Sequence, residues 1–263
     1  MSIIHSLKLT LKKSLPNSIY GMLWLLPRYR EYPAILAFIV RPTLHASFRQ
    51  RIAILFRIVK ISVNIQCLHT TDEVLRYVRT ILTLPKEMKG VVVEAGCFQG
   101  GSTAKFSLAA DLADRELVVF DSFQGIPHHE EEHGVSIFGE TAVFPEGVYT
   151  ATLDQVKKNV ALYGKVDRCR FIRGWFEDTM PNFHERVAAA YLDVDLATST
   201  KTCLKYLYPL MVNGGTLYSQ DGHLPLVLDV FCDETFWRTE VGDKAPTVHG
   251  FGASKLIMLV KSA

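Results

Sequence analysis

From residue 66 to the end of the chain, short apolar runs alternate with segments of helical periodicity. The runs carry few polar residues, which is typical of strands buried on both faces of a sheet. The predicted strands are 89–95, 116–121, 168–173, 187–193, 215–219 and 254–261. The predicted helices are 70–84, 101–113, 152–163, 198–210 and 224–237. This alternation predicts a doubly wound α/β domain over residues 66–263, with a mostly parallel sheet and a last strand antiparallel to the rest.

Residues 1–65 differ from the rest of the chain in charge and hydropathy. They contain ten Lys or Arg and one acidic residue, so their net charge is +9, against −7 for the other residues. We predict a basic, apolar helical extension that packs on the domain or on a second copy in a homodimer, or lies peripherally on an anionic membrane surface. Its longest uncharged run, 14–27, is 14 residues long and too short to span a bilayer. Basic residues are not interleaved with aromatic platforms, so no nucleic-acid partner is expected.

The length and the cysteine pattern limit the class of protein. A chain of 263 residues with 48% hydrophobic content suits one α/β domain with an extension. Its five cysteines include no C-x-x-C pair, which favours neither a disulfide framework nor a zinc site and indicates a reducing compartment. The N-terminus lacks the order of basic, apolar and small residues of a secretory signal. We therefore expect a cytoplasmic location, with peripheral membrane attachment as an alternative.

The end of the first predicted strand opens into a glycine-rich turn, Glu94-Ala-Gly-Cys-Phe-Gln-Gly-Gly-Ser102. It is not the G-x-G-x-x-G fingerprint of dinucleotide sites. It resembles the E-x-G-x-x-x-G motif of S-adenosylmethionine-dependent methyltransferases, in which glycine lets the backbone approach the ligand. The alternative is an ordinary strand-to-helix turn. The candidate cofactor-binding residues here are Glu94, Gly96, Gly100, Gly101 and Ser102.

Two further strand ends add candidate cofactor contacts. Asp121 ends the second strand, about twenty residues further on, where a carboxylate accepts hydrogen bonds from ribose hydroxyls. Ser122 follows it directly, and Trp175, just after the third strand, offers a ring that could wall an adenine. The alternative for Trp175 is an anchor of the following turn in the core.

Acidic residues also follow the fourth and fifth strands, as Asp193-Val-Asp195 and Gln220-Asp221-Gly-His223. If these strands are neighbours, Asp193 or Asp195 meets Asp221 at one edge of the sheet. Oxygen ligands on short loops suit a hard divalent cation such as Mg²⁺. The alternative is a set of helix caps, because Asp195 could cap the next helix by itself.

Residues 66–263 resemble the macrocin O-methyltransferase family, which methylates sugar hydroxyls in antibiotic pathways with S-adenosylmethionine and Mg²⁺. The resemblance rests on five segments in order: 94–102, 119–127, 174–181, 192–200 and 207–215. It implies a class I methyltransferase fold with a seven-stranded sheet, and Asp193 as a metal ligand. The family carries two adjacent aspartates where this chain has Gln220-Asp221, so Asp221 matches as a charged ligand and Gln220 offers only a neutral oxygen.

Methyl transfer to a sugar hydroxyl needs an acceptor oxygen that loses its proton as the new bond forms. Asp193 and His223 are the candidate catalytic bases, with no geometric ground for choosing between them. The segment 127–150 is long, rich in His and Glu, and follows the ribose position, which is typical of a lid. We interpret its His-Glu cluster as solvated, with a base from His128 or His129 as the alternative.

Two other functions stay open at this stage. Asp193-Val-Asp195 could be the D-x-D motif of a nucleotide-sugar glycosyltransferase, although the glycine-rich turn upstream argues against it. The chain could also be a non-catalytic, membrane-associated scaffold, since a fold does not prove an activity. Our prediction is an S-adenosylmethionine-dependent O-methyltransferase, assisted by Mg²⁺, that acts on a sugar or a glycosylated small molecule.

Overall fold

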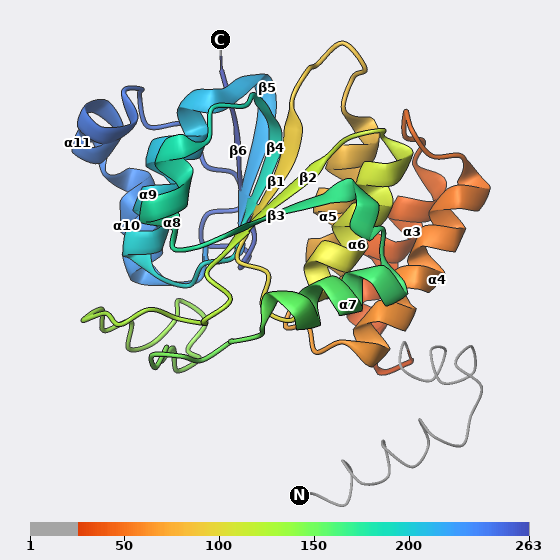
Figure 1. Ribbon diagram of the computed structural model, residues 1–263, viewed down its shortest axis with the longest axis horizontal. Coiled ribbons are helices and arrows are strands. Elements are labelled where there is room, and N and C mark those ends of the chain that lie inside the picture. The colour runs from red at the N-terminus through yellow and green to blue at the C-terminus, as the bar shows by residue number, and fades with distance from the viewer. Residues whose placement is uncertain (1–25, 263) are drawn as a thin grey trace, which may run out of the picture.

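The computed structural model describes residues 26–262, which form a central sheet covered by helices on both faces (Figure 1). Within these residues the sheet has six strands in the order β3-β2-β1-β4-β5-β6. The strands are β1 Val91–Ala95, β2 Leu117–Asp121, β3 Cys169–Arg173, β4 Val187–Leu192, β5 Met211–Ser219 and β6 Ile257–Val260. All neighbours pair in parallel except β5 and β6, which are antiparallel. The predicted doubly wound, mostly parallel α/β fold is therefore confirmed.

Helices from the two halves of the chain cover opposite faces of the sheet (Figure 1). One face carries α3 Tyr32–Val40, α4 Phe48–Asn64, α5 Thr71–Thr83, α6 Gly101–Leu112 and α7 Leu153–Tyr163. The other carries α8 Phe176–Thr179, α9 Ala197–Leu207, α10 Pro225–Cys232 and α11 Glu234–Phe236. Short 3-10 or π turns are η1 Leu26–Glu31, η2 Val166–Arg168, η3 Met180–Asn182, η4 Tyr208–Leu210 and η5 Trp237–Val241. Each face buries its own apolar cluster against the sheet.

The described part of the N-terminal extension is helical, as expected. Helix α4 begins with a capping box in which Ser47 and Gln50 bond each other's backbone N–H groups. Its apolar side, with Ile54 and Ile58, is buried in the same cluster as α5 and α6. Helices α3 and α4 thus form an outer layer over α5 and α6. Residues 1–25 of the predicted extension lie outside the described residues.

The expectation of seven strands is wrong for residues 26–262, in which the sheet has six. The segment before β6 touches that strand through a single antiparallel bridge between His249 and Met258. Pro246, which has no N–H to donate, precedes the bridge, and the turn residues Gly250 and Gly252 follow it with φ of +85° and +71°. A longer ladder does not form because these residues bend the chain on either side of His249.

The last two predicted helices end earlier than expected. Pro209 cannot continue helix α9, and the chain passes into η4 instead. The stretch predicted as one helix, 224–237, is divided at Asp233, whose side chain accepts a hydrogen bond from Phe236 N and begins a new helix. These changes lie far from the strand ends that carry the candidate site.

The register of β1, β4 and β5 brings their carboxyl ends to one edge of the sheet. Ala95 pairs with Leu192, and Leu192 pairs with Ser219. Beyond the strands, Asp193 N donates to Ala95 O at 2.9 Å and Gln220 N donates to Leu192 O at 2.8 Å. The strand order reverses between β1 and β4, and doubly wound sheets bind their ligands at such a reversal.

Candidate functional site

A cavity of about 300 Å³ opens at this edge of the sheet, between the loops that follow the strands. It is lined by residues from both halves of the fold, including most of the residues predicted from the sequence. The predicted residues in its wall are Gly96, Gly101, Ser102, Asp121, Ser122, Trp175, Asp193, Gln220, Asp221 and His223. Glu94 and Gly100, which belong to the glycine-rich turn, are buried and are not among the lining residues.

The glycines of the turn are required by neighbouring protein atoms. A Cβ on Gly96, whose φ is +82°, would lie 1.9 Å from the carbonyl oxygen of Asp193. Gly100 has φ of +78° and packs against Val156 of helix α7, which a Cβ would meet at 2.9 Å. The sequence motif predicts that these glycines make room for a ligand. The structure supplies another cause, namely close contact between β1, β4 and α7.

Glu94, at the end of β1, is fully buried, and neither of its carboxyl oxygens has a hydrogen-bond partner among the described residues. Burial raises the pKa of Glu94 to about 8. Unpartnered buried oxygens are costly, and they are satisfied by a donor group or by a water molecule. The Ser102 and Thr103 hydroxyl groups beside Glu94 act against the rise in its pKa without cancelling it.

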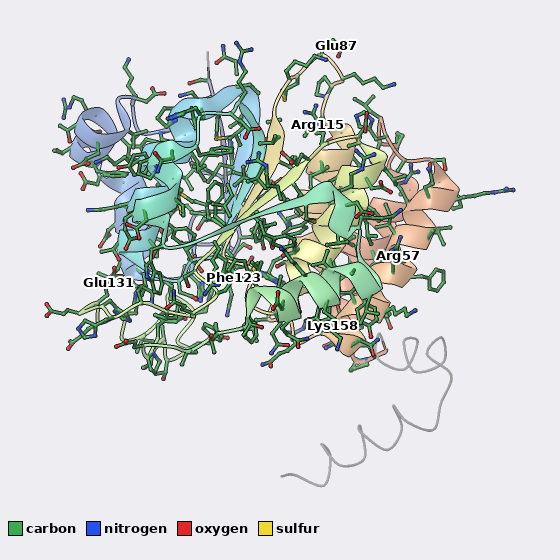
Figure 2. All side chains as sticks on the ribbon, in the orientation of Figure 1. Arg57, Glu87, Arg115, Phe123, Glu131 and Lys158 are labelled. Atoms are coloured by element: carbon green, nitrogen blue, oxygen red, sulfur yellow. The ribbon has the colours of Figure 1, made fainter. Side chains whose placement is uncertain are left out.

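Asp121 is held in one orientation by two backbone N–H groups. Its Oδ2 accepts from Cys97 N at 2.7 Å and its Oδ1 accepts from Phe123 N at 2.6 Å (Phe123 is labelled in Figure 2). Each carboxylate oxygen has a further lone pair, so Asp121 can still accept from hydroxyl groups of a ligand in the cavity. Trp175 lines the same cavity from the start of α8.

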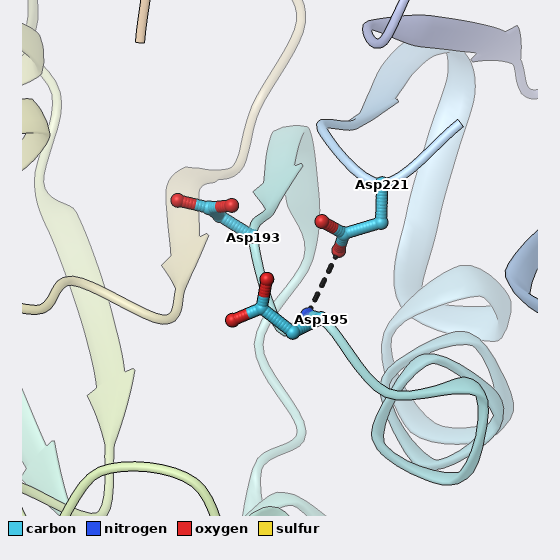
Figure 3. Close-up of side chains that lie close together, drawn as sticks. All are labelled: Asp193, Asp195 and Asp221. Atoms are coloured by element: carbon cyan, nitrogen blue, oxygen red, sulfur yellow. Dashed lines mark hydrogen bonds between the residues drawn. The ribbon is translucent and has the colours of Figure 1, made fainter. Parts of the chain in front are cut away.

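Three carboxylates meet on the opposite wall: Asp193, Asp195 and Asp221 (Figure 3). One oxygen from each lies within 4.8 Å of the others. Asp221 Oδ2 accepts from the backbone N–H groups of Val194 and Asp195, both at 3.0 Å, which fixes the strand-five loop against the strand-four loop. Asp195 has φ of +60°, a strained conformation for a non-glycine residue.

The electrostatics of these carboxylates favour a bound cation. Burial, followed by the charge of Asp193, raises the pKa of Asp221 to about 7. Burial and the charges of Asp221 and Asp193 raise the pKa of Asp195 well above its ordinary value. Like charges this close are relieved by a proton or by a cation. Asp195 lies with Asp193 and Asp221 in this cluster. The predicted ligand Gln220 is engaged elsewhere, because its Oε1 accepts a hydrogen bond from the Tyr191 hydroxyl at 2.7 Å.

Sequence reasoning missed His69, which lies between Cys67 and Asp193. Its Nε2 is 2.9 Å from Asp193 Oδ2 and its side chain is 6% exposed. Burial opposes the charged imidazole, but the adjacent Asp193 carboxylate outweighs it, and the pKa of His69 is raised well above its ordinary value. His69 precedes helix α5, in a stretch without a motif, so only the tertiary contact identifies it.

His223 lines the cavity on the strand-five side, and its Nδ1 is buried without a hydrogen-bond partner among the described residues. Burial and the charge of Lys255 lower the pKa of His223. The carbonyl of His223 accepts from Ile137 N at 2.9 Å, which ties this corner to segment 127–150.

Segment 127–150 is largely irregular and forms one side of the cavity, which is consistent with the expected lid. Glu131, labelled in Figure 2, accepts from the N–H groups of Ala197 and Thr198 and so anchors the segment to the start of α9. The interpretation of a solvated His-Glu cluster is wrong for His133, which is 7% exposed and 3.1 Å from Glu131. His128 and His129 are absent from the cavity wall, because they contact Glu146 and the Phe144 carbonyl instead.

No helix among residues 26–262 combines the length and the apolar character needed to cross a membrane.

Comparison with solved structures supports the fold. The structure of the O-methyltransferase NovP superimposes with a TM-score of 0.63 at 21% identity, covering 94% of this chain and all of the other. A calicheamicin methyltransferase, CalS11, gives a TM-score of 0.55 at 16% identity, covering 83% of this chain and 95% of the other. At these identities the likeness concerns the fold alone.

Sequence comparison identifies the family. The chain is 36% identical over 143 residues to a mycinamicin III 3''-O-methyltransferase of Micromonospora griseorubida, covering 52% of this chain and 56% of the relative. It is 33% identical over 171 residues to a rhamnosyl-tetracenomycin-C 4'-O-methyltransferase of Streptomyces olivaceus, covering 62% and 64%. The chain thus spans less than two thirds of the curated relatives it matches. The profile of the Macrocin-O-methyltransferase (TylF) family matches residues 70–228, and the chain therefore belongs to this family.

Proposed function

We propose that the protein is an S-adenosylmethionine-dependent O-methyltransferase that acts on a hydroxyl group of a sugar or of a glycosylated small molecule. The observation that carries the proposal is the composition of the cavity. One wall contains the glycine-rich turn and Asp121, and the other contains Asp193, Asp195 and Asp221. The first wall would hold the methyl donor, and the second would hold the acceptor.

The first wall fits S-adenosylmethionine. Asp121 is oriented to accept from the two ribose hydroxyls, and Trp175 offers a ring beside an adenine. Gly101 and Ser102 line the turn, and Glu94, which is buried and outside the cavity wall, would reach the ammonium end of the cofactor through water. When bound, the cofactor supplies a methyl group on a positively charged sulfur.

The second wall fits Mg²⁺, whose preferred ligands are carboxylate oxygens and water. Asp193, Asp195 and Asp221 would hold the ion, and Gln220 stays a candidate through its amide oxygen. A divalent cation there would lower the pKa of an acceptor hydroxyl and fix its direction. The burial and mutual repulsion of Asp195 and Asp221 support the assignment, because a cation relieves both.

The chain itself supplies two candidates for the acceptor's proton. Asp193 lies in the cavity with Oδ2 held by His69, which fixes the direction of its carboxylate. His223 lies in the same cavity with an unpartnered Nδ1. Segment 127–150 would exclude water from the reacting groups, since eight of its residues line the cavity: Pro127, Ser136, Glu140, Thr141, Ala142, Val143, Phe144 and Tyr149.

The acceptor class follows from the family and from the relatives. The curated relatives carry names of enzymes that methylate positions on glycosylated compounds, the 3'' position in mycinamicin III and the 4' position in a rhamnosyl tetracenomycin. We infer a sugar hydroxyl as the acceptor here. Family membership argues against a D-x-D glycosyltransferase, and the acidic residues of the cavity argue against a non-catalytic scaffold.

We also propose that the protein is cytoplasmic and that the N-terminal layer touches an anionic membrane surface. Large apolar side chains on α3 and α4 are exposed, among them Leu36 at 61% and Phe56 at 66%. Exposed basic residues such as Arg41 and Arg49 lie on the same layer. Sedimentation with vesicles of 30% phosphatidylserine tests this, with neutral vesicles as the control; a concentration-dependent dimer without vesicle binding would favour the homodimer instead.

Calorimetric titration with S-adenosylhomocysteine, with and without Mg²⁺, tests the main proposal. We expect binding by the wild type and a weakening by Asp121→Asn, because the amide replaces one acceptor with a donor that faces backbone N–H groups. Asp178→Asn, on the exposed side of α8, is the matched control. Folded protein that gives no heat under any condition would refute the cofactor assignment.

A further inference from the structure

Cys67, which the proposed reaction does not use, lies in the cavity wall beside two groups that can carry positive charge. Lys105 Nζ, from helix α6, is 3.1 Å from its sulfur, and His69 Nδ1 is 3.3 Å away. His69 in turn contacts Asp193. Residues from three separate segments thus place a thiol, an amine, an imidazole and a carboxylate in one connected row.

The surroundings of Cys67 favour its thiolate. Lys105 is 1% exposed, and a buried ammonium group is costly unless an acceptor with negative charge is adjacent. Burial of Cys67 opposes ionisation, but the charge of Lys105 and the hydrogen bond and charge of His69 outweigh it, and the pKa falls from 9.0 to about 6. Tyr191 also lies within reach of the Cys67 charge, and its pKa is raised well above its ordinary value, so it stays neutral.

The other cysteines with perturbed thiols show the opposite behaviour. Cys97 also lines the cavity, yet burial and the charge of Asp121 raise its pKa well above the ordinary value. Burial raises the pKa of Cys169 to about 12, and burial also raises that of Cys203. Among the buried and half-buried cysteines, reactivity is therefore expected to favour Cys67, since the thiolate is the nucleophile. Cys232 is exposed and open to the same reagents, so each cysteine must be followed separately.

We propose that Cys67 is a covalent modification site for small soft electrophiles, such as haloacetamides and α,β-unsaturated carbonyl compounds, and that its adduct and the cofactor exclude each other. The sulfur lies against the glycine-rich turn, since a Cβ on Gly101 would lie 3.4 Å from Sγ. An added group would extend into the cavity that Gly96 and Ser102 also line. The mutual exclusion, though not the reactivity, rests on the proposed function.

The reaction needs no partner beyond the electrophile. With iodoacetamide, Sγ forms a bond to the methylene carbon and iodide leaves with the electron pair of the broken bond. With an unsaturated carbonyl compound, Sγ bonds to the β-carbon, the electron pair of the double bond moves to the α-carbon, and water supplies the proton. The Lys105 ammonium group loses its counter-charge in either case.

The first test is iodoacetamide labelling of the wild type between pH 5 and pH 9, with peptide mass spectrometry to follow each cysteine. The Cys67 rate should be half-maximal near pH 6 and flat above pH 7, because its pKa is about 6. At pH 6 it should exceed that of N-acetylcysteine by about 20-fold, since a roughly 500-fold larger thiolate fraction is offset by the weaker nucleophilicity of a low-pKa thiolate. A rate that still climbs through pH 9, or an unlabelled Cys67, would overturn the proposal.

Two variants and one ligand complete the test. Lys105→Met should move the midpoint of the Cys67 profile to higher pH, with folding checked by circular dichroism; an unmoved midpoint in folded protein contradicts the role of Lys105. Iodoacetamide should reduce S-adenosylhomocysteine binding by the wild type. In Cys67→Ser, treated and untreated samples should bind S-adenosylhomocysteine equally well. Cys97→Ser, the matched control in the same cavity, should leave that loss intact.

Saturating S-adenosylhomocysteine should slow Cys67 labelling at least tenfold. Undiminished labelling in the presence of calorimetrically verified binding would overturn the mutual exclusion. An absence of binding heat would instead refute the proposed function, and the labelling profile without ligand would then decide the reactivity of Cys67.

Discussion

Gly96→Ala should destabilise the fold and disturb the site at once, because Gly96 touches the backbone of Asp193. An added Cβ would lie 1.9 Å from the Asp193 carbonyl oxygen, where ordinary van der Waals contact begins at 3.4 Å. Side chains and solvent cannot relieve the clash, since the opposing atom belongs to the backbone between β4 and α9. The loops after β1 and β4 must therefore separate.

The magnitude has two parts. Alanine at φ of +82° costs about 1–2 kcal/mol, since this conformation is unfavourable for L-residues. Overpacking against a fixed neighbour adds about 1–3 kcal/mol. The total of roughly 2–5 kcal/mol corresponds to a fall in melting temperature of roughly 5–15 °C for a chain of this size. A displacement of Asp193 by about 1 Å would also reduce methyl transfer by roughly 100-fold.

Thermal unfolding followed by circular dichroism measures the first effect, and turnover of a methyl acceptor measures the second. Gly242→Ala is the matched control, because Gly242 has φ of +77° with no neighbour within 4 Å of an added Cβ. It should show only the cost of the backbone conformation. If Gly96→Ala melts at the same temperature as Gly242→Ala, the clash with Asp193 is not rigid and our account of the glycine-rich turn fails.

Three further predictions concern stability and the lid. The pKa of Glu94 is raised to about 8 in the folded protein, so its contribution to the free energy of unfolding is present below about pH 4.5 and is lost as the pH rises through 8. Glu94→Gln should therefore flatten the pH dependence of stability between those values, as measured by urea titrations. A pH profile unchanged by the substitution would contradict this. Glu131→Ala removes the acceptor for the N–H groups of Ala197 and Thr198, which should free segment 127–150 and speed its proteolysis. Equal cleavage rates in the variant and the wild type would show that other contacts hold the segment. Ser47→Ala should cost about 1 kcal/mol in thermal unfolding, and a loss below about 0.3 kcal/mol would mean that the capping box of α4 is unimportant.

The fold was largely predictable from local pattern. The apolar runs that form β1, β2 and β4 are buried on both faces, so few polar residues interrupt them. Their assignment as strands was therefore clear from the sequence. The seventh strand was wrong because the resemblance supplied it: the segment near His249 is bent by proline and glycine, and it pairs at a single point.

The site was predictable where it follows strand ends. Asp121, Asp193 and Asp221 each lie at the end of a strand or within two residues of it, and parallel strands bring such positions to one edge. The sequence could not decide whether Gln220 or Asp195 joins Asp193 and Asp221 in the proposed metal site. That choice depends on the direction of side chains in two adjoining loops, where Tyr191 engages Gln220 and the left-handed Asp195 turns toward the other carboxylates.

Sequence alone determined what depends on neighbours along the chain: the helices, the buried strands, the glycine-rich turn and the acidic residues at strand ends. Tertiary structure decided what depends on contacts across long separations. His69 meets Asp193 across 124 residues, and Cys67 meets Lys105 across 38, so neither pair leaves a local pattern. The physical reason is that hydrophobic periodicity records burial, whereas the protonation and reactivity of a buried polar group depend on which few atoms the folded chain places beside it.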